Sequence, residues 1–217
     1  MSDVIKHECG IAFIRLLKPL SYYQEKYGSW MYGIQRLYLL MEKQHNRGQD
    51  GAGVASVKLN SALGKPYIDR TRSNSKSPIR EVFDTIYNKI ENSGERWKDV
   101  KWVKDNAPFA GEIYLGHLRY GTHGGNSIEY VHPVMRSSNW RGRNLVLAGN
   151  FNLTNVDEIF AQLLEIGQHP RDLSDTVTVL EKIGYFLDEE YESMLQHYKN
   201  NNENLKAATH IIDRELD

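Results

Sequence analysis

Hydrophobic positions along the chain fall into two kinds of pattern. Short apolar or alternating runs favour buried strands at 9–14, 54–59, 113–118 and 144–148. Apolar residues three or four positions apart predict helices at 21–46 and 79–90, and two more that begin near Asn155 and Ser174. Strands and helices are therefore mixed, which indicates an α/β or α+β fold.

The helix expected at 21–46 has its clearest apolar face around Ile34. Trp30, Ile34, Leu37 and Met41 recur at spacings of 4, 3 and 4, which places them on one side of a helix. Gly28 disfavours helix in the first half of the segment, as does Gly33, so the helix is best defined from Ile34 onward.

Two capped helices are expected in the last third of the chain. Asn155 can cap the first, with Glu158 three residues later, and Ser174 can cap the second. The buried face of the second helix is expected to carry Val177, Leu180, Ile183 and Leu187. The polar stretch 189–217 is expected to be helical, whereas the polar stretch 60–78 is interpreted as a long surface loop.

The charge balance argues against a polyanion-binding protein. The 217 residues include 27 Lys and Arg against 28 Asp and Glu, a net charge of -1. A solvated loop explains the basic residues of 60–80 better than a nucleic-acid patch; they are Lys65, Arg70, Arg72, Lys76 and Arg80. No apolar run approaches the ~18 residues of a membrane span, and the first residues lack a secretory pattern. We expect a soluble cytoplasmic protein with neither nucleic acid nor membrane as a partner.

The chain has one cysteine, Cys9. A single thiol excludes an internal disulfide framework and a multi-cysteine zinc site. His117, His123 and His132 do not form a His-Glu-x-x-His pattern, so no metal site is predicted.

Cys9 has two interpretations. A lone cysteine is commonly a small buried hydrophobe. It becomes a nucleophile with its own base if the Glu8–Cys9 bond is cleaved, because a free α-amine has a pKa of about 7.7–8.0. The second interpretation requires residues 1–8 to be a leader that is removed.

Five sequence blocks in order support the nucleophile. They are Cys-Gly-Ile at 9–11, His-Asn-Arg-Gly-Gln-Asp-Gly-Ala-Gly at 45–53, Gly-His-Leu-Arg-Tyr-Gly-Thr-His-Gly at 116–124, Asn-Phe-Asn-Leu-Thr-Asn at 150–155, and Ser-Asp at 174–175. The series closely resembles the class II glutamine amidotransferases, which are N-terminal-nucleophile glutaminases. The Arg-Gly-Gln-Asp block is most similar to the amidophosphoribosyltransferase branch, since the sugar-phosphate branch typically has Tyr in place of Gln49. The Thr-His-Gly at 122–124 is shared with the sugar-phosphate branch.

The resemblance implies a fold and a reaction centre. The fold is an N-terminal-nucleophile hydrolase sandwich with four layers, α/β/β/α, expected here to be truncated at its C-terminal end. Cys9 is the implied nucleophile that attacks the side-chain amide of glutamine. The tetrahedral oxyanion is stabilised in the family by an asparagine side chain and the next backbone N–H, which map onto Asn150 and Phe151. The family usually has Gly at the position of Phe151 and His at that of Gly149.

The resemblance also implies how free glutamine is held. Arg119 maps onto the arginine that binds the α-carboxylate, and Asp175 onto the aspartate that binds the ammonium group. Thr122 and His123 resemble further substrate contacts. Arg47 and Gly48 resemble the support for the nucleophile's end of the site. Asp175 also has a purely structural interpretation, because an acid after a capping serine stabilises a helix N-terminus.

The resemblance runs across residues 9–175 and implies a glutaminase domain at 9–217, expected to be incomplete. No Asp-Asp-Ser/Thr loop for phosphoribosyl pyrophosphate occurs, so the phosphoribosyltransferase domain, with its Mg²⁺, is expected to be absent, and no cofactor is expected in this domain. The implied partners are L-glutamine, the acceptor domain and, at full length, further copies in a homo-oligomer. Two alternatives stay open: the same glutaminase serving another acceptor such as fructose 6-phosphate, or a non-catalytic interaction module that keeps its leader.

Overall fold

The computed structural model describes residues 8–62, 64–121 and 127–201. Contacts divide these residues into two compact units. The first unit comprises the described residues up to Pro133 together with Ala148–Asn150, and the second comprises Val134–Leu147 and the described residues from Phe151 onward. Both contain helices and an antiparallel sheet, so the mixed fold class is confirmed.

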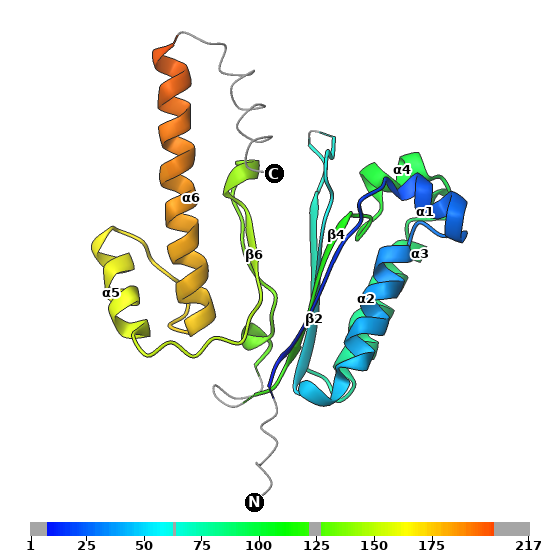
Figure 1. Ribbon diagram of the computed structural model, residues 1–217, viewed down its shortest axis with the longest axis horizontal. Coiled ribbons are helices and arrows are strands. Elements are labelled where there is room, and N and C mark those ends of the chain that lie inside the picture. Colours follow the sequence, from blue (N-terminus) through cyan, green and yellow to red (C-terminus); the bar gives the residue numbers. More distant parts are fainter. Residues whose placement is uncertain (1–7, 63, 122–126, 202–217) are drawn as a thin grey trace, which may run out of the picture. The chain divides into compact units, whose positions relative to one another are not determined.

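The first unit is built on a four-stranded antiparallel sheet in the order β1-β4-β2-β3. Helices α2 and α3 pack on one face of this sheet, α2 over β1 and β4, and α3 over β2 and β3 (Figure 1). The strands are β1 (Gly10–Arg15), β2 (Gly51–Val57), β3 (Ile68–Ser73) and β4 (Ile113–Arg119). The helices are α1 (Leu20–Tyr27), α2 (Tyr32–Lys43), α3 (Pro78–Glu91) and α4 (Val100–Asn106), with 3-10 turns at His45–Arg47, Glu95–Lys98 and Ile128–Tyr130.

The helix expected at 21–46 is two helices. Gly28 ends α1 in the left-handed conformation, with a φ of 74°, where glycine has no steric penalty. Trp30 lies in the connection but is fully buried, and the apolar stripe of α2 buries Ile34, Leu37 and Met41 against the sheet. The predicted core residues are therefore correct, although one helix was expected where two occur.

The surface loop expected at 60–78 is partly wrong, because β3 occupies Ile68–Ser73. Its six residues pair along β2, so the strand is stabilised by the neighbouring backbone more than by an apolar face. The strand expected at 54–59 also begins earlier, at Gly51, inside the glycine-rich block. Neither segment shows the apolar alternation typical of a strand, because β3 is polar and β2 begins with glycines.

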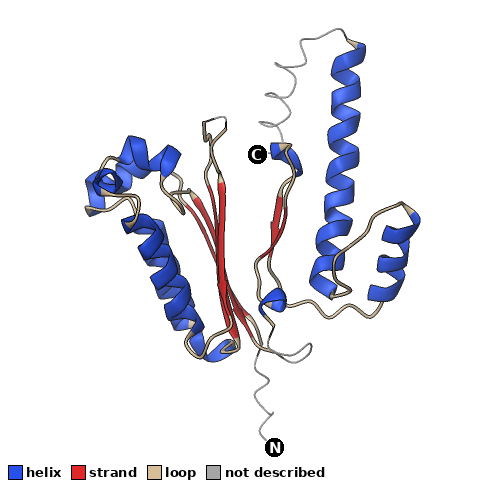
Figure 2. Ribbon diagram, turned by 180° about the vertical axis from the view of Figure 1, so that it is seen from behind, coloured by secondary structure: helices blue, strands red, loops and turns tan. Residues whose placement is uncertain are grey.

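The second unit is a two-stranded sheet covered by helices. Strand β5 (Val134–Arg136) pairs antiparallel with β6 (Leu145–Leu147), and a 3-10 turn at Arg141–Arg143 connects them. Helix α6 (Asp175–Asn200) packs against both strands and against α5 (Val156–Glu165), as Figure 2 shows.

The buried face of α6 differs from the expected one. Leu180 is buried as expected, but Ile183 is 38% exposed. The face that packs on the sheet instead includes Gly184, whose lack of a side chain admits Arg136; an added Cβ would lie 2.5 Å from Arg136 Cδ. Both expected caps begin their helices, but neither the Asn155 nor the Ser174 side chain makes a capping hydrogen bond.

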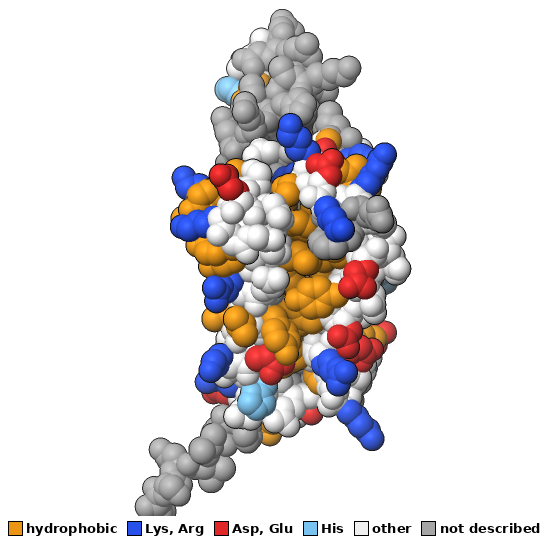
Figure 3. Space-filling model, turned by 90° about the vertical axis from the view of Figure 1, so that its right-hand side faces the viewer, with side chains coloured by type: hydrophobic (Ala, Val, Ile, Leu, Met, Phe, Trp, Pro, Cys, Tyr) orange, Lys and Arg blue, Asp and Glu red, His pale blue; other side chains and the backbone are white. Residues whose placement is uncertain are grey.

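The helical layer of the first unit carries exposed hydrophobic side chains. A band of them crosses the view in Figure 3, and the exposed residues of α1 and α2 include Tyr22, Tyr27, Leu39 and Leu40. Among the helices of the described residues, none combines the length and hydrophobicity needed to span a membrane. The four-layer arrangement of the two sheets stays a prediction.

Candidate active site

Strand pairing brings Cys9 to the end of β4. Cys9 directly precedes β1, whose first residue, Gly10, pairs with Leu118 near the end of β4. Its Sγ lies 3.5 Å from the backbone N of Tyr120, which donates to it, and 4.0 Å from the Tyr120 carbonyl oxygen. The thiol is partly exposed and therefore accessible.

Arg119 ends β4 on the sheet face that points away from α2. Gly116 and Leu118 contact α2 or lie in the core with it, so the alternation of side chains turns His117 and Arg119 to the opposite face. Arg119 is 5% exposed, and its guanidinium lies 5.6 Å from the centre of the Tyr130 ring. A largely buried cation thus lies one residue from the backbone group that contacts the Cys9 thiol.

The Arg-Gly-Gln-Asp block holds the segment around Arg119. A Cβ on Gly48 would lie 2.7 Å from backbone atoms of Leu118 and Arg119, so only glycine allows this close approach. Asp50 donates its N–H to the Arg119 carbonyl (3.0 Å), and its carboxylate accepts the Gly121 N–H (2.8 Å). Asp50 was not among the predicted site residues, although its place in this block was a usable signal.

Arg47 contacts the residue that precedes the nucleophile. Its Nη2 lies 3.4 Å from Oε2 of Glu8, and both side chains are more than half exposed. Such an exposed ion pair contributes little to stability. Arg47 therefore touches the end of the predicted leader and not the Cys9 thiol.

Two glycines of β2 let a second segment lie on the sheet. A Cβ on Gly53 would lie 2.1 Å from the His132 carbonyl oxygen, and one on Gly51 would lie 2.8 Å from Val131 Cγ2. From β3, Arg72 donates to the Val131 carbonyl (2.8 Å) and Arg70 to that of Pro133 (3.3 Å). The two arginines interpreted as a solvated loop thus fix the segment 131–133.

His132 in this segment packs against His117. Their ring centres are 4.5 Å apart; His117 is fully buried and His132 partly so. The pKa of His117 is lowered to about 3 and that of His132 to about 4, mainly by burial, and the positive charge of Arg119 contributes to both shifts. Both imidazoles are therefore neutral at physiological pH. Sequence reasoning considered them only as metal ligands and gave no sign of this pair.

Asn150 belongs to the first unit with Cys9. The preceding Gly149 is buried and donates its N–H to Nδ1 of His132 at 3.5 Å, while Asn150 itself is exposed. Phe151 belongs to the second unit. Among the described residues other than glycine, only Asn60 and Phe109 have positive φ, so the backbone at Phe151 accommodates its side chain.

Asp175 is the first residue of α6 in the second unit. Its Oδ2 accepts the backbone N–H of Leu153 at 2.7 Å, which ties the segment after Phe151 to the start of the helix. Thr122 and His123 lie outside the described residues. The first unit therefore contains Cys9, Arg47, Gly48, Arg119 and Asn150, and the substrate-binding roles of the predicted residues stay predictions.

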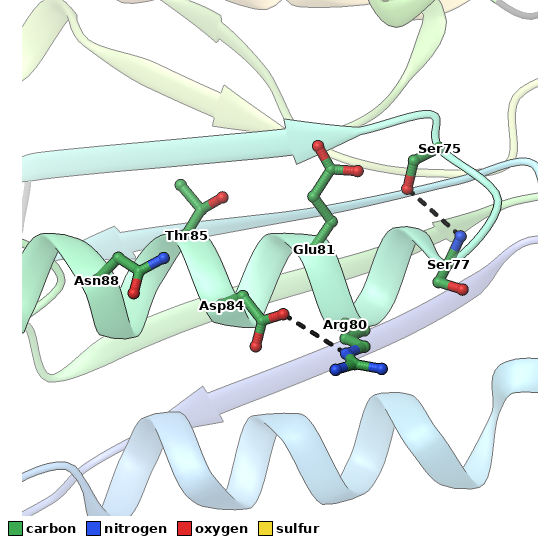
Figure 4. Close-up of a pocket in the computed structure, with 7 residues that line it drawn as sticks. All are labelled: Ser75, Ser77, Arg80, Glu81, Asp84, Thr85 and Asn88. Atoms are coloured by element: carbon green, nitrogen blue, oxygen red, sulfur yellow. Dashed lines mark hydrogen bonds and ion pairs between the residues drawn. The ribbon is translucent and has the colours of Figure 1, made fainter.

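A separate polar hollow lies at the start of α3 (Figure 4). Its floor includes the exposed ion pair between Arg80 Nε and Asp84 Oδ2 (3.6 Å), and no predicted site residue lines it. Its lining residues are Ser75, Ser77, Arg80, Glu81, Asp84, Thr85 and Asn88. Within the described ranges, no group of three or more His, Cys, Asp or Glu could hold a metal ion.

Comparison with known proteins finds no matching family model. The chain is 29% identical over 146 residues to amidophosphoribosyltransferase 2, chloroplastic, of Arabidopsis thaliana, covering 67% of this chain and 21% of the relative. It is 32% identical over 155 residues to amidophosphoribosyltransferase of Bacillus subtilis, covering 69% and 26%. It is 25% identical over 159 residues to glutamine–fructose-6-phosphate aminotransferase (isomerizing) of Zymomonas mobilis, covering 73% and 20%.

The chain thus spans about a quarter or less of these relatives' lengths. A solved structure described as the allosteric regulatory enzyme of purine biosynthesis aligns with 82% of this chain and 33% of its own, at 21% identity and a TM-score of 0.40. The sequence matches carry the assignment. The chain is a distant homologue of the class II glutamine amidotransferases, and most of the relatives it matches are amidophosphoribosyltransferases.

Proposed function

We propose that this chain is the glutaminase portion of an amidophosphoribosyltransferase-like enzyme. It hydrolyses the side-chain amide of glutamine through a γ-glutamyl thioester on Cys9 and supplies ammonia to a phosphoribosyl acceptor. The observation that carries the proposal is the contact of the Cys9 thiol with Tyr120, directly after the buried Arg119. It joins the first and third of the matching sequence blocks through two residues that are 111 positions apart.

The chemistry requires cleavage between Glu8 and Cys9. The freed α-amine, with a pKa of about 7.7–8.0, takes the thiol proton as sulfur attacks Cδ of glutamine. The amine then gives the proton to the departing amide nitrogen, so that ammonia is released and a γ-glutamyl thioester remains on Cys9. Water hydrolyses this thioester to glutamate and regenerates the thiol. The Asn150 amide and the Phe151 N–H are proposed to donate to the oxyanion in both steps.

Opposed charges orient the substrate in this proposal. Arg119 can donate two parallel hydrogen bonds to the α-carboxylate, and Asp175 accepts from the ammonium group. Thr122 and His123 add further contacts, and Gly48 and Asp50 support Arg119 through its backbone. The fixed ends of glutamine place its amide carbon beside the sulfur.

The proposed acceptor is supported by sequence similarity alone. Amidophosphoribosyltransferases from Arabidopsis thaliana and Bacillus subtilis, together with the Arg-Gly-Gln-Asp block, support phosphoribosyl pyrophosphate, held with Mg²⁺ by a separate acceptor domain of a homo-oligomeric enzyme. The second candidate acceptor is fructose 6-phosphate. It is supported by the Zymomonas mobilis relative and by the Thr-His-Gly at 122–124. Ammonia transfer by the full-length protein to each acceptor distinguishes the two.

The test compares two forms of the chain, one beginning at Cys9 and one keeping residues 1–8. The processed form should release ammonia from glutamine, and a glutamine-analogue diazoketone should alkylate its Cys9, adding the mass of the analogue less the N2 that leaves. The leader-bearing form should do neither, because its Cys9 nitrogen is an amide. A processed form that neither hydrolyses glutamine nor is labelled would contradict the proposal and favour a non-catalytic module.

Asn150→Ala tests the oxyanion role in the processed enzyme. Loss of one oxyanion donor typically lowers kcat about 10²–10³-fold, or ~3 kcal/mol, so a loss of that size is expected with KM little changed. Asn155→Ala is the matched control, because Asn155 is exposed and its side chain makes no capping bond. Wild-type turnover in Asn150→Ala would remove the assigned role.

A further inference from the structure

A row of residues crosses the sheet on the face that carries Arg119. Ile11, His117, Gly53 and Arg72 are successive partners across β1, β4, β2 and β3, so their side chains point to one face. The segment 131–133 lies against this row, fixed by the space at Gly53 and by Arg72. The backbone of His132 is thereby held by its close contact with Gly53 and by the hydrogen bond from Arg72 to the preceding residue, Val131.

The ring of His132 is held by His117. The centres of the two rings are 4.5 Å apart at an angle of 49°. His117 is itself fully buried on the sheet, so its ring offers a fixed packing surface to His132. Buried contact with a second ring restricts the rotation of the His132 imidazole.

The imidazole of His132 faces the backbone that leads to Asn150. Gly149 donates its N–H to Nδ1 of His132, which requires an unprotonated Nδ1 and places the proton of the neutral ring on Nε2. If Nδ1 were protonated, its N–H would point at the N–H of Gly149 and the hydrogen bond would be lost. Ala148–Asn150 belongs to the first unit although the residues on both sides belong to the second, and this hydrogen bond is one of its ties there.

We propose that His132 is a positioning residue that places Asn150 for oxyanion stabilisation by accepting the Gly149 N–H, with His117 holding its ring in place. The inference rests on the proposed function and adds a residue to the site. Asn150 is adjacent to the anchored Gly149, so a loss of this bond shifts its amide. A displacement of about 1 Å at a reacting centre can cost on the order of 10²-fold in rate.

The activity test uses two variants of His132 in the processed chain. His132→Leu removes the acceptor and keeps apolar bulk, and we expect kcat to fall roughly 10–100-fold with KM within about twofold. His132→Asn offers an acceptor near the position of Nδ1 and should retain kcat within about threefold of wild type. His169→Leu, at an exposed histidine of the second unit, should leave both parameters unchanged. Wild-type kcat in His132→Leu, or equal impairment of both variants, overturns the proposal.

A spectroscopic measurement on the wild-type chain tests the hydrogen bond independently of activity. Imidazole ¹⁵N spectra should show His132 protonated on Nε2 alone, with an unprotonated Nδ1 that couples to the Gly149 amide proton. A proton on Nδ1 overturns the positioning role even if glutamine is hydrolysed. An inactive wild-type chain overturns the proposed function, and with it the role of Asn150, even if the hydrogen bond is found.

Discussion

At the scale of single residues, the chemistry of the site depends on neighbours that are distant in sequence. The Cys9 thiol meets Tyr120 because β1 and β4 pair, and His117 meets His132 because Gly53 leaves room for a backbone. Burial then keeps the two histidines uncharged by lowering their pKa values. Two packed imidazoles that stay neutral at physiological pH are a consequence of this burial and cannot be inferred from the residue type alone.

The two histidines predict a loss of stability in acid. Their pKa values, about 3 for His117 and about 4 for His132, lie below the ~6.5 of an unfolded histidine, so the unfolded chain binds more protons below that pH. The free energy of unfolding contributed by the pair should be constant above pH 7 and fall between about pH 6.5 and 3. Urea unfolding at several pH values measures this slope.

Carboxylates also titrate in this range, so a variant isolates the histidines. His117→Phe keeps a buried ring without a titrating group, and its stability should fall less steeply with pH than that of the wild type. His169→Leu serves as the exposed control and should follow the wild-type slope. Parallel slopes for wild type and His117→Phe would show that His117 does not resist protonation.

At the scale of elements, the glycine-rich block and β3 both allow other parts of the chain to pack closely on the sheet. Gly48 and Gly53 allow close approach of backbone and Gly51 that of the Val131 side chain, while the arginines of β3 donate to carbonyls of the segment 131–133. The block therefore serves packing around the candidate site.

Gly53→Ala should destabilise the first unit. The new Cβ would lie 2.1 Å from a backbone oxygen, which cannot move as a flexible side chain can, so about 1–3 kcal/mol or more of unfolding free energy should be lost. Gly121→Ala is the control, because its Cβ would meet its neighbours at 3.4 Å or more. Thermal unfolding compares the two, and equal melting temperatures would contradict the close approach.

A network of partly buried ion pairs joins α6 to the two-stranded sheet of the second unit. Arg136 of β5 donates to two acids of α6, Glu181 (3.2 Å) and Asp188 (3.1 Å). Arg143 pairs with a third acid of the same helix, Glu192 (3.0 Å). The Arg136 side chain is 17% exposed and that of Asp188 27%. The acidic partners of Arg136, Glu181 and Asp188, lie on the face of α6 that packs on the sheet, together with Gly184.

Asp188→Asn should weaken that packing. Removing one partner leaves the Arg136 cation undercompensated, and because both groups are slightly exposed we expect a loss of about 1–3 kcal/mol. Asp84→Asn breaks an ion pair whose side chains are 83% and 62% exposed, and should change stability by less than about 0.5 kcal/mol. Chemical denaturation followed by a probe in the second unit makes the comparison; equal effects would contradict the structural role of the network.

At the scale of the whole chain, the two units differ in core size. The first buries a large cluster that joins the helices to the sheet, whereas a separate cluster in the second has Tyr191 and Leu195 as its buried members. Local stability follows buried apolar contact. The units are therefore expected to open with different free energies.

Hydrogen exchange tests this difference. Amides of β2 and β4 should exchange last, at the rate of global unfolding, and those of α5 should exchange well before them. Peptide-level mass spectrometry of the intact chain provides the rates. Protection of α5 equal to that of β4 would indicate one cooperative unit instead of two.

The sequence by itself determined the strands at 9–14 and 113–118, the helix at 79–90 and the relationship to glutamine amidotransferases, because these depend on local periodicity and on ordered motifs. It also identified Cys9, Arg119 and Asn150 as candidates. Only the tertiary structure decided that polar β3 is a strand, that Ile183 faces solvent and that His132 accepts from Gly149. Each of these depends on a partner distant in the sequence. Periodicity can be recognised from neighbouring residues, whereas side-chain packing and burial depend on which distant segments come together.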